Sequence, residues 1–193
     1  MNGFFCAEVV LRAYIDGYFP MAEHRNGNIY WHSPDPRAIF PLYEIQASRK
    51  DRQSFRKYNF TFTTNKRFDD VIRYCAERDD TWINDEIKMT YIELHELGYA
   101  HSIETYHEDK LVGGLYGVSI AGAFFGESMF NILPNASKAA FYYLIEHLKS
   151  RGFLLLDSQY INPFTKQLGA IEIRKSTYLK LLKQALNLEV KFT

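Results

Sequence analysis

Three polar side chains stand in or directly after apolar segments of the chain: Glu127, Asp157 and Gln159. Glu127 lies in the middle of the apolar run 124–130, where a buried charge costs several kcal/mol unless it is paired or hydrogen-bonded. Asp157 and Gln159 follow a short apolar run, and residues two apart in a strand point to the same side, so both could face one cleft. The carboxylate of Glu127 could bind a hydroxyl or an ammonium group, whereas the amide of Gln159 is a poor base and suits positioning. On the residues alone, hydrogen bonds that stabilise strand ends are the commoner explanation.

The second half of the chain contains the elements that must position these side chains. Its predicted elements are strands at 101–106, 111–120 and 123–130, a helix over 137–150, a strand over 153–159 and a last helix over 176–186. This order indicates an α/β or α+β layer in which helices pack on a mixed sheet. Because ligands gather outside strand ends in such sheets, the end of the 153–159 strand is the favoured site.

The first half of the chain has weaker patterns. Its expected elements are a short helix at 7–14, an extended loop at 30–37, strands at 38–42 and 60–63, a helix over 66–78 and another after Asn84. Two prolines forbid a regular helix in the loop. Asn65 is expected to cap the helix over 66–78, and Gly98 is expected to end the helix that follows.

Composition limits the class of protein. The chain has 193 residues, is 47% hydrophobic and has a formal net charge of zero, which suits one ordinary domain with a small appendage. Nucleic-acid binders are usually basic, so a nucleic-acid partner would need a local patch of charge. The two cysteines make no disulfide framework, no secretory leader is visible, and no apolar run approaches the ~20 residues of a membrane span. We therefore expect a cytoplasmic monomer without membrane contact.

One segment of the chain is strongly basic. Residues 48–57 carry five cations against one acid, which suits contacts with phosphates. A solvated surface explains the same pattern about equally well. The candidate phosphate ligands are Arg37, Arg49, Lys50, Arg52, Arg56, Lys57 and Lys138.

The sequence predicts no metal site and no cofactor. His95 and His101 lie six apart and lack a third ligand at a suitable spacing for zinc. The glycines at 113, 114 and 117 match neither a dinucleotide-binding loop nor a Walker loop.

Short motifs along almost the whole chain resemble those of one known family. They are YIDGYFPM at 14–21, WHSPDPR at 31–37, TWI at 81–83, LHELGYAHSIE at 94–104, LVGGLYGV at 111–118, FFGESMFN at 124–131 followed by ASK at 136–138, LDSQ at 156–159 and LGA at 168–170. Each motif is weak alone, but their order and spacing are highly specific. The chain thus resembles the leucyl/phenylalanyl-tRNA–protein transferases, which move an amino acid from a charged tRNA to the N-terminus of a protein.

The resemblance implies a fold and an activity. The implied fold is α+β, with a small N-terminal domain at 1–63 and an acetyltransferase-like (GNAT) domain at 64–193, whose mixed sheet is flanked by helices. The implied activity is transfer of Leu, or of Phe or Met, from aminoacyl-tRNA to proteins that expose an N-terminal Arg or Lys, which marks those proteins for degradation. The activated ester of the donor requires no added cofactor.

The resemblance also implies roles for individual residues. Asp157 would orient Gln159 at the reacting centre, and Glu127 would lie near the bound aminoacyl end. The pocket for the aminoacyl side chain would be formed by Trp31, His32, Trp82, Phe124 and Met129. His32 replaces a second tryptophan of the family, so the preference between Leu and Phe is left open. Ordinary core packing competes with the pocket assignment of these apolar side chains.

Three alternatives remain at this point. The same chemistry could act on proteins with acidic N-termini. A CoA-dependent acetyltransferase on the same fold would need a Gly-rich pyrophosphate loop, where this chain has NILPN at 131–135. A module that binds N-terminal residues or tRNA without catalysis is the third alternative, and the presence of Glu127, Asp157 and Gln159 argues against it.

Overall fold

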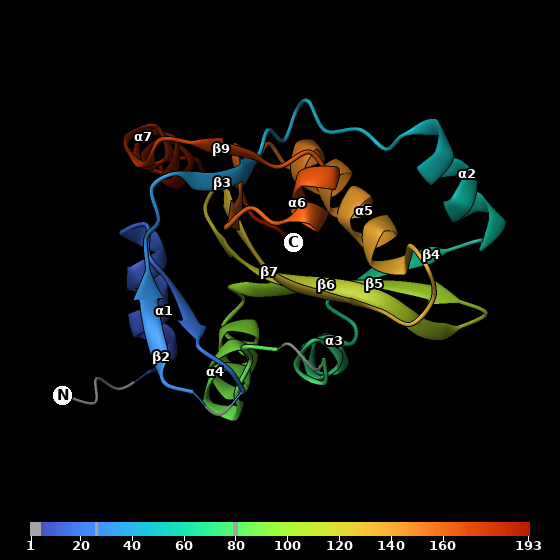
Figure 1. The fold of residues 1–193 in the computed structure, drawn as a ribbon, viewed down its shortest axis with the longest axis horizontal. Coiled ribbons are helices and arrows are strands. Elements are labelled where there is room, and N and C mark those ends of the chain that lie inside the picture. The colour runs from blue at the N-terminus through green and yellow to red at the C-terminus, as the bar shows by residue number, and fades with distance from the viewer. Residues whose placement is uncertain (1–4, 26, 79–80) are drawn as a thin grey trace.

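The computed structural model describes residues 5–25, 27–78 and 81–193, which form two sheets and the helices around them (Figure 1). The smaller sheet is the antiparallel hairpin of β1 (Phe19–Ala22) and β2 (Ile29–His32). In spatial order, the strands of the larger sheet are β4 (Thr61–Thr64), β5 (Ala100–His107), β6 (Lys110–Ile120), β7 (Ala123–Asn131), β8 (Leu155–Gln159), β3 (Arg37–Phe40) and β9 (Ile171–Ile173). All neighbours in this sheet are antiparallel except β7 and β8, so the sheet is mixed.

Helices cover both faces of the larger sheet. In Figure 1, α3 (Phe68–Ala76) and α4 (Asp85–Glu96) lie on one side of β5 and β6, and α5 (Ala136–Ser150) lies on the other. The remaining helices are α1 (Ala7–Ile15), α2 (Arg49–Lys57), α6 (Pro163–Gln167) and α7 (Lys175–Leu186). None of the helices in the described ranges combines the length and the apolar character needed to cross a membrane.

The buried apolar side chains form two clusters. The first cluster contains residues of α1, α3, α4 and α7, whereas the second contains residues of α5 together with the C-terminal Phe192. Neighbouring residues of β7 alternate between them, because Phe125 belongs to the first cluster and Phe124 to the second. This alternation is what a strand covered on both faces requires.

The two parallel strands separate at their carboxyl ends. α5 carries the chain back across the sheet, which lets β7 and β8 run parallel. Their pairing ends at Phe125 opposite Asp157, although both strands continue beyond that point. Beyond this point no backbone pairing joins β7 and β8, so side chains from the two strand ends lie between them.

A β-bulge on β7 takes Glu127 out of the regular ladder. Gly117 of β6 pairs with Gly126 and Tyr116 pairs with Ser128, so Glu127 is the extra residue on β7. Bulges re-aim side chains and are common beside active sites. This local irregularity explains how a carboxylate can sit in an otherwise apolar strand.

Most predictions for the second half of the chain are confirmed. β5, β6, β7, α5, β8 and α7 occur close to the predicted ranges, and so do α1 and α4 in the first half. The Asn84 side chain caps α4 by accepting a hydrogen bond from the N–H of Ile87. The prediction of an α+β fold with a mixed sheet flanked by helices is therefore confirmed.

Several predictions for the first half are wrong. The segment 30–37 is not one extended loop, because most of β2 and the start of β3 lie within it. Asn65 does not cap α3, since its Oδ1 accepts from the backbone N–H of Ser102. The carboxylate of Glu104 instead accepts from two backbone N–H groups that precede α3. The sequence pattern also does not predict β1, α2, α6 and β9.

The division of the chain at residue 63 stays a prediction. β3 precedes this boundary and lies between β8 and β9 in the larger sheet, while β4 spans it at the sheet edge. The hairpin of β1 and β2 forms a separate sheet, which packs close to α1 in Figure 1. The site described below uses residues from both sides of the predicted boundary.

Candidate functional site

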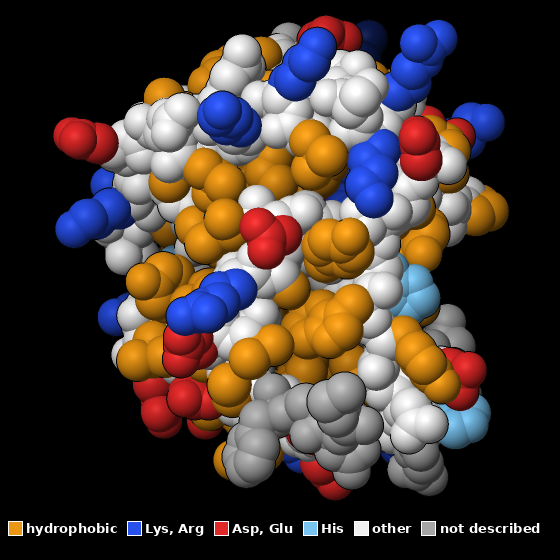
Figure 2. All heavy atoms as spheres, turned by 90° about the vertical axis from the view of Figure 1, so that its left-hand side faces the viewer, with side chains coloured by type: hydrophobic (Ala, Val, Ile, Leu, Met, Phe, Trp, Pro, Cys, Tyr) orange, Lys and Arg blue, Asp and Glu red, His pale blue; other side chains and the backbone are white. Residues whose placement is uncertain are grey.

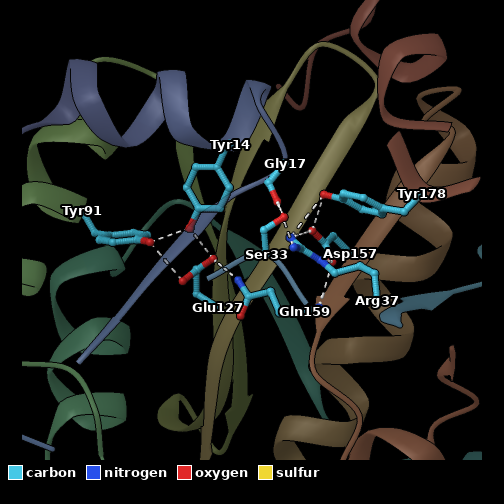
Figure 3. A network of polar contacts seen from close by, with 9 residues as sticks. All are labelled: Tyr14, Gly17, Ser33, Arg37, Tyr91, Glu127, Asp157, Gln159 and Tyr178. Atoms are coloured by element: carbon cyan, nitrogen blue, oxygen red, sulfur yellow. Dashed lines mark hydrogen bonds and ion pairs between the residues drawn. The ribbon is translucent and has the colours of Figure 1, made fainter. Parts of the chain in front are cut away.

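Glu127 and Gln159 meet where β7 and β8 separate (Figure 3). Gln159 Nε2 donates a hydrogen bond to Glu127 Oε1 over 2.7 Å, which bridges the two strand ends. Glu127 is partly buried, and Gln159 has 9% of its surface exposed. Two of the residues singled out in the sequence are therefore together at the carboxyl ends of parallel strands, where open α/β sheets bind their ligands.

Two buried tyrosines complete the surroundings of Glu127. Tyr14 of α1 donates to Oε1 over 2.6 Å, and Tyr91 of α4 donates to Oε2 over 3.0 Å. The two phenol oxygens also lie 2.5 Å apart, and either can be the donor in that contact. Burial, followed by the nearby Glu127, raises the pKa of both phenols well above the ordinary value. Each phenol therefore keeps its single proton at neutral pH.

The hydrogen count in this cluster favours a protonated carboxyl. Three contacts join the two phenols and the carboxyl group, and each contact needs one hydrogen. The phenols supply two hydrogens, so all three contacts are filled only when Glu127 also carries a proton. In agreement, burial raises the pKa of Glu127 to about 8, although hydrogen bonds from Tyr14, Tyr91 and Gln159 oppose the shift. Such a carboxyl can give or take a proton close to neutral pH.

Gln159 is held in an unusual backbone conformation. Its φ is 64°, a left-handed value that costs about 1–2 kcal/mol for a residue with a Cβ atom. Its backbone N–H donates to Asp157 Oδ1 over 2.8 Å, which fixes the turn at the end of β8. The side-chain Nε2 is used by Glu127, whereas Oε1 accepts no hydrogen bond from the described part of the chain. That oxygen can receive an N–H from a bound amine.

Asp157 is fully buried beside a buried cation. Arg37 Nε and Nη2 donate to the two oxygens of Asp157 over 3.0 and 2.6 Å, and the Tyr178 hydroxyl donates over 2.8 Å. Arg37 Nη1 donates to the carbonyl oxygen of Gly17 over 3.0 Å. A buried ion pair is tolerated when further hydrogen bonds satisfy its donors and acceptors, as they do here.

The structure corrects the assignment of Arg37 to tRNA phosphates. Only 1% of its surface is exposed, and each of its three nitrogens donates to a protein oxygen. The same guanidinium lies over the rings of Phe19 and Tyr178, at 4.6 and 4.5 Å from their centroids. A phosphate in solvent cannot reach a side chain enclosed in this way.

Three of the five predicted pocket residues belong to or pack against the two core clusters, and not all to the same one. His32 reaches the end of β8, because its Nδ1 lies 3.0 Å from the Tyr160 hydroxyl. Trp82 is partly buried against the first cluster, which also contains Tyr14 and Tyr91. Phe124 is fully buried in the second cluster, and Met129 packs against that cluster. The assignment of these residues to one pocket stays a prediction.

Hydrophobic side chains gather on the face that carries α1 and the β1–β2 hairpin (Figure 2). β2 contributes Tyr30 and Trp31, with 46% and 39% of their surface exposed. Tyr160, which follows β8, is 43% exposed. Trp31 is therefore accessible to a ligand, in contrast to the buried Phe124.

The other candidate phosphate ligands lie on α2 or pack against it. Arg49, Lys50, Arg52, Arg56 and Lys57 are exposed, and none forms an ion pair with a residue in the described ranges. No residue of α2 is buried. Lys138 differs from these five, because it pairs with Asp51 over 2.8 Å and has 14% of its side chain exposed.

Sequence reasoning misses three tyrosines of the site: Tyr14, Tyr91 and Tyr178. Each lies in an amphipathic helix, where an aromatic residue at a buried position normally indicates core packing. Tyr14 also opens the motif at 14–21, which is the one signal that could have singled it out. Within the described ranges, no group of three or more His, Cys, Asp or Glu side chains could hold a metal ion.

Comparisons with known proteins agree with the motifs. A family profile described as "Leucyl/phenylalanyl-tRNA protein transferase" matches residues 39–183, and the profile of the corresponding N-terminal domain matches residues 3–35. Relatives named leucyl/phenylalanyl-tRNA–protein transferase occur in Gloeobacter violaceus and Prosthecochloris aestuarii. They are 48% and 49% identical to this chain, over 96% and 95% of its length and 96% of their own.

Likeness to solved structures is weaker. The structure of L-PGS from Bacillus licheniformis aligns with a TM-score of 0.42 and 13% identity, covering 86% of this chain and 49% of that one. A likeness at this level carries no argument about fold or function, so the GNAT-like assignment stays a prediction.

Proposed function

The chain belongs to the leucyl/phenylalanyl-tRNA–protein transferase family, and from this premise we propose that it transfers Leu, or Phe or Met, from aminoacyl-tRNA to other proteins. The acceptors are proteins that expose an N-terminal Arg or Lys, and the added residue marks them for degradation. The observation that carries the proposal is the contact between Glu127 and Gln159 at the strand ends. A module that only binds tRNA would not need this buried network of acid, amide and phenols.

The reaction is aminolysis of an ester. The α-amine of the acceptor attacks the carbonyl carbon of the aminoacyl ester, a C–N bond forms, and the bond to the ribose oxygen of tRNA breaks. The amine loses one proton and the ribose oxygen gains one, so no oxidant, reductant or metal is consumed. An α-amine has a pKa near ~8, so a good share is already neutral at pH 7. Holding the amine and the ester in register can therefore supply much of the acceleration.

The proposed roles follow from which polar atoms of the site are already hydrogen-bonded and which are available to a substrate. Gln159 Oε1 accepts an N–H of the attacking amine, while Nε2 stays on Glu127. Glu127, held by Tyr14 and Tyr91, faces the aminoacyl end and can exchange a proton near neutral pH. Asp157 acts through Gln159, because it holds the backbone of that residue.

The remaining assignments concern the donor. We propose that the aminoacyl side chain contacts residues implied by the motifs: Trp31, His32, Trp82 and Met129. Phe124 can join them only if the second cluster opens, because none of its surface is exposed. The exposed cations of α2 contact tRNA phosphates, because they are free of carboxylate partners within the described ranges. Lys138 can join them only if it leaves Asp51.

The proposal includes the GNAT-like class and the cellular setting. The crossover from β7 through α5 to β8, with strand ends that separate, supports an acetyltransferase-like arrangement. We assign residues 1–63 to a small N-terminal domain and 64–193 to the transferase domain. The protein is proposed to work as a cytoplasmic monomer.

The test is transfer of labelled Leu from Leu-tRNA to model peptides that begin with Arg, Lys, Asp or Glu, read by mass spectrometry. A gain of one Leu on the Arg and Lys peptides is expected. Transfer to the acidic peptides alone would keep the chemistry and replace the acceptor rule. No transfer to any peptide, with charged tRNA still bound, would refute the transferase proposal.

A further inference from the structure

We propose that Arg37 and Tyr178 are positioning residues for the transfer reaction, acting through Asp157 to fix Gln159. The three residues Arg37, Asp157 and Tyr178 are called the Asp157 clamp below. This inference rests on the proposed function, because it gives the clamp a role in aligning the amine at Gln159. Neither Arg37 nor Tyr178 is placed in contact with a substrate.

The Asp157 carboxylate has no capacity left for a substrate. It accepts two hydrogen bonds from Arg37, one from Tyr178 and one from the backbone of Gln159. Four donors match the roughly four acceptor positions of a carboxylate. With 0% of its surface exposed, Asp157 cannot bind the amine directly, so its effect must pass through Gln159.

The partners of Asp157 come from separate parts of the chain. Arg37 lies on β3 and Tyr178 on α7, and both are buried, with 1% of the surface of each exposed. Arg37 also donates to the carbonyl oxygen of Gly17, between α1 and β1. Figure 3 shows the Arg37 guanidinium and the Tyr178 hydroxyl gathered around Asp157, with Gly17 next to Arg37. The clamp thus ties three segments to the strand that carries Gln159.

The backbone of Gln159 needs such support. A side chain other than glycine at φ 64° is held in a sparsely populated conformation, which persists when surrounding contacts determine it. The contact from the Gln159 N–H to Asp157 Oδ1 is the one that the clamp controls. If Asp157 rotates, this N–H loses its acceptor and the Gln159 amide is no longer aimed at Glu127.

Tyr178→Phe is the most selective variant. It removes the hydroxyl that donates to Asp157 and leaves the ring beneath the Arg37 guanidinium. Arg37→Lys is the second variant, because it keeps the charge but loses the two-pronged contact with Asp157. Tyr116→Phe is the matched control, since the buried Tyr116 hydroxyl has no hydrogen-bond partner in the described part of the chain.

Kinetics give the first readout. We expect Tyr178→Phe to lower kcat about tenfold and to leave KM for aminoacyl-tRNA within about twofold, because it removes the hydrogen bond to Asp157 and the longer one from Arg37 Nη2. Arg37→Lys should lower kcat further, and Tyr116→Phe should match the wild type. An active wild type with an unchanged kcat in Tyr178→Phe would overturn the inference.

Hydrogen exchange gives a readout that does not depend on activity. The Gln159 backbone amide should exchange about tenfold faster in Tyr178→Phe than in the wild type, while amides in the centre of β6 should stay equally protected. Unchanged exchange at Gln159 in both variants would overturn the inference. If the wild type transfers no amino acid, the proposed function fails, and the exchange rates alone decide whether the clamp holds Gln159.

Discussion

The strand ends of β7 and β8 and the surface of α2 hold polar groups in opposite ways. At the strand ends, Asp157 and Gln159 are buried and Glu127 is partly buried, and hydrogen bonds to neighbouring protein groups fix their positions. On α2, five cations are exposed and make no ion pair with the described residues. Buried polar groups in fixed positions can distinguish a correctly placed substrate from a misplaced one. Exposed cations attract phosphates over a distance, and salt weakens that attraction.

This difference suggests a division of labour. Changes at the strand ends should affect the rate of transfer once substrates are bound, because they move groups beside the reacting atoms. Changes on α2 should affect the affinity for tRNA, because they remove charge without disturbing the core. The predictions below are ordered from the largest expected effect to the smallest.

Gln159→Ala should have the largest effect on the transfer rate of any change at the strand ends. We expect the maximal transfer rate to fall by about 10² to 10³, the loss typical of removing a group aimed at the reacting centre. The affinity for aminoacyl-tRNA should stay within about twofold. Single-turnover transfer to a peptide beginning with Arg measures both quantities. An equal rate for the variant and the wild type would show that the contact with Glu127 is merely structural.

Removing three cations from α2 should have the next largest effect. The variant Arg49→Ala, Arg52→Ala and Arg56→Ala should weaken tRNA binding by about 10- to 100-fold and reduce the salt dependence of binding by about two to three charges. Alanine favours helix, so α2 should persist.

A matched control removes three exposed cations elsewhere, with the changes Arg151→Ala, Lys180→Ala and Lys183→Ala. Filter binding of aminoacyl-tRNA from about 50 to 200 mM salt compares the two variants. Equal losses in both would mean that net charge, rather than the surface of α2, attracts the tRNA.

Glu127→Gln should change how stability depends on pH. Because burial raises the pKa of Glu127 to about 8, the folded state keeps a proton that the unfolded chain releases near pH 4.5. The stability that this proton gives is present below pH 4.5 and is lost as pH rises through about 8. The variant cannot titrate, so it should gain about 3 to 4 kcal/mol relative to the wild type between about pH 5 and pH 8.

Urea unfolding at about pH 5, 6.5 and 8 measures this difference. The triple α2 variant is the control. Its cations are exposed, so replacing them should leave the pH dependence of the free energy of unfolding unchanged. A difference between Glu127→Gln and the wild type that does not vary with pH would mean that the carboxyl is ionised in the folded state.

His32→Trp should have the smallest effect. The larger ring restores the aromatic pair of the family motif and breaks the contact with Tyr160. If His32 borders the aminoacyl pocket, the ratio of Phe to Leu transfer should change by about three- to tenfold, the scale of modest changes in a hydrophobic pocket. Competition between Phe-tRNA and Leu-tRNA measures the ratio. Tyr43→Phe is the control, because the Tyr43 hydroxyl donates to the carbonyl oxygen of Phe153, before the start of β8, whereas His32 contacts Tyr160 after its end. An unchanged ratio would remove His32 from the pocket.

The sequence predicts which polar residues lie at the strand ends, but not which residues they bind. Glu127 stands out because a carboxylate conflicts with its apolar run, and Asp157 and Gln159 stand out at the end of a strand. Their partners cannot be predicted from spacing, because Tyr14 lies 113 residues from Glu127 and Arg37 lies 120 residues from Asp157. The burial of Arg37 against Asp157 depends on the fold and cannot be predicted from the prolines that precede Arg37 in the sequence.

The exposed region shows the converse. The charges of α2 are evident in the sequence, but its helical conformation is not. No residue of α2 is buried, so the segment lacks the regularly spaced apolar residues that indicate a helix. The strands from β5 to β8 are predicted well, since their apolar runs are bounded by turns. Short elements such as β9 and α6 carry too little pattern to be predicted.

The most direct test of the division of labour is single-turnover transfer of Leu from Leu-tRNA at increasing enzyme concentration. The wild type, Gln159→Ala and the triple α2 variant are measured side by side with one peptide that begins with Arg. The account predicts that Gln159→Ala lowers the rate at saturation without moving the half-saturating concentration. It predicts that the α2 variant moves the half-saturating concentration without lowering the rate at saturation. The reverse pattern, or the same change in both variants, would contradict it.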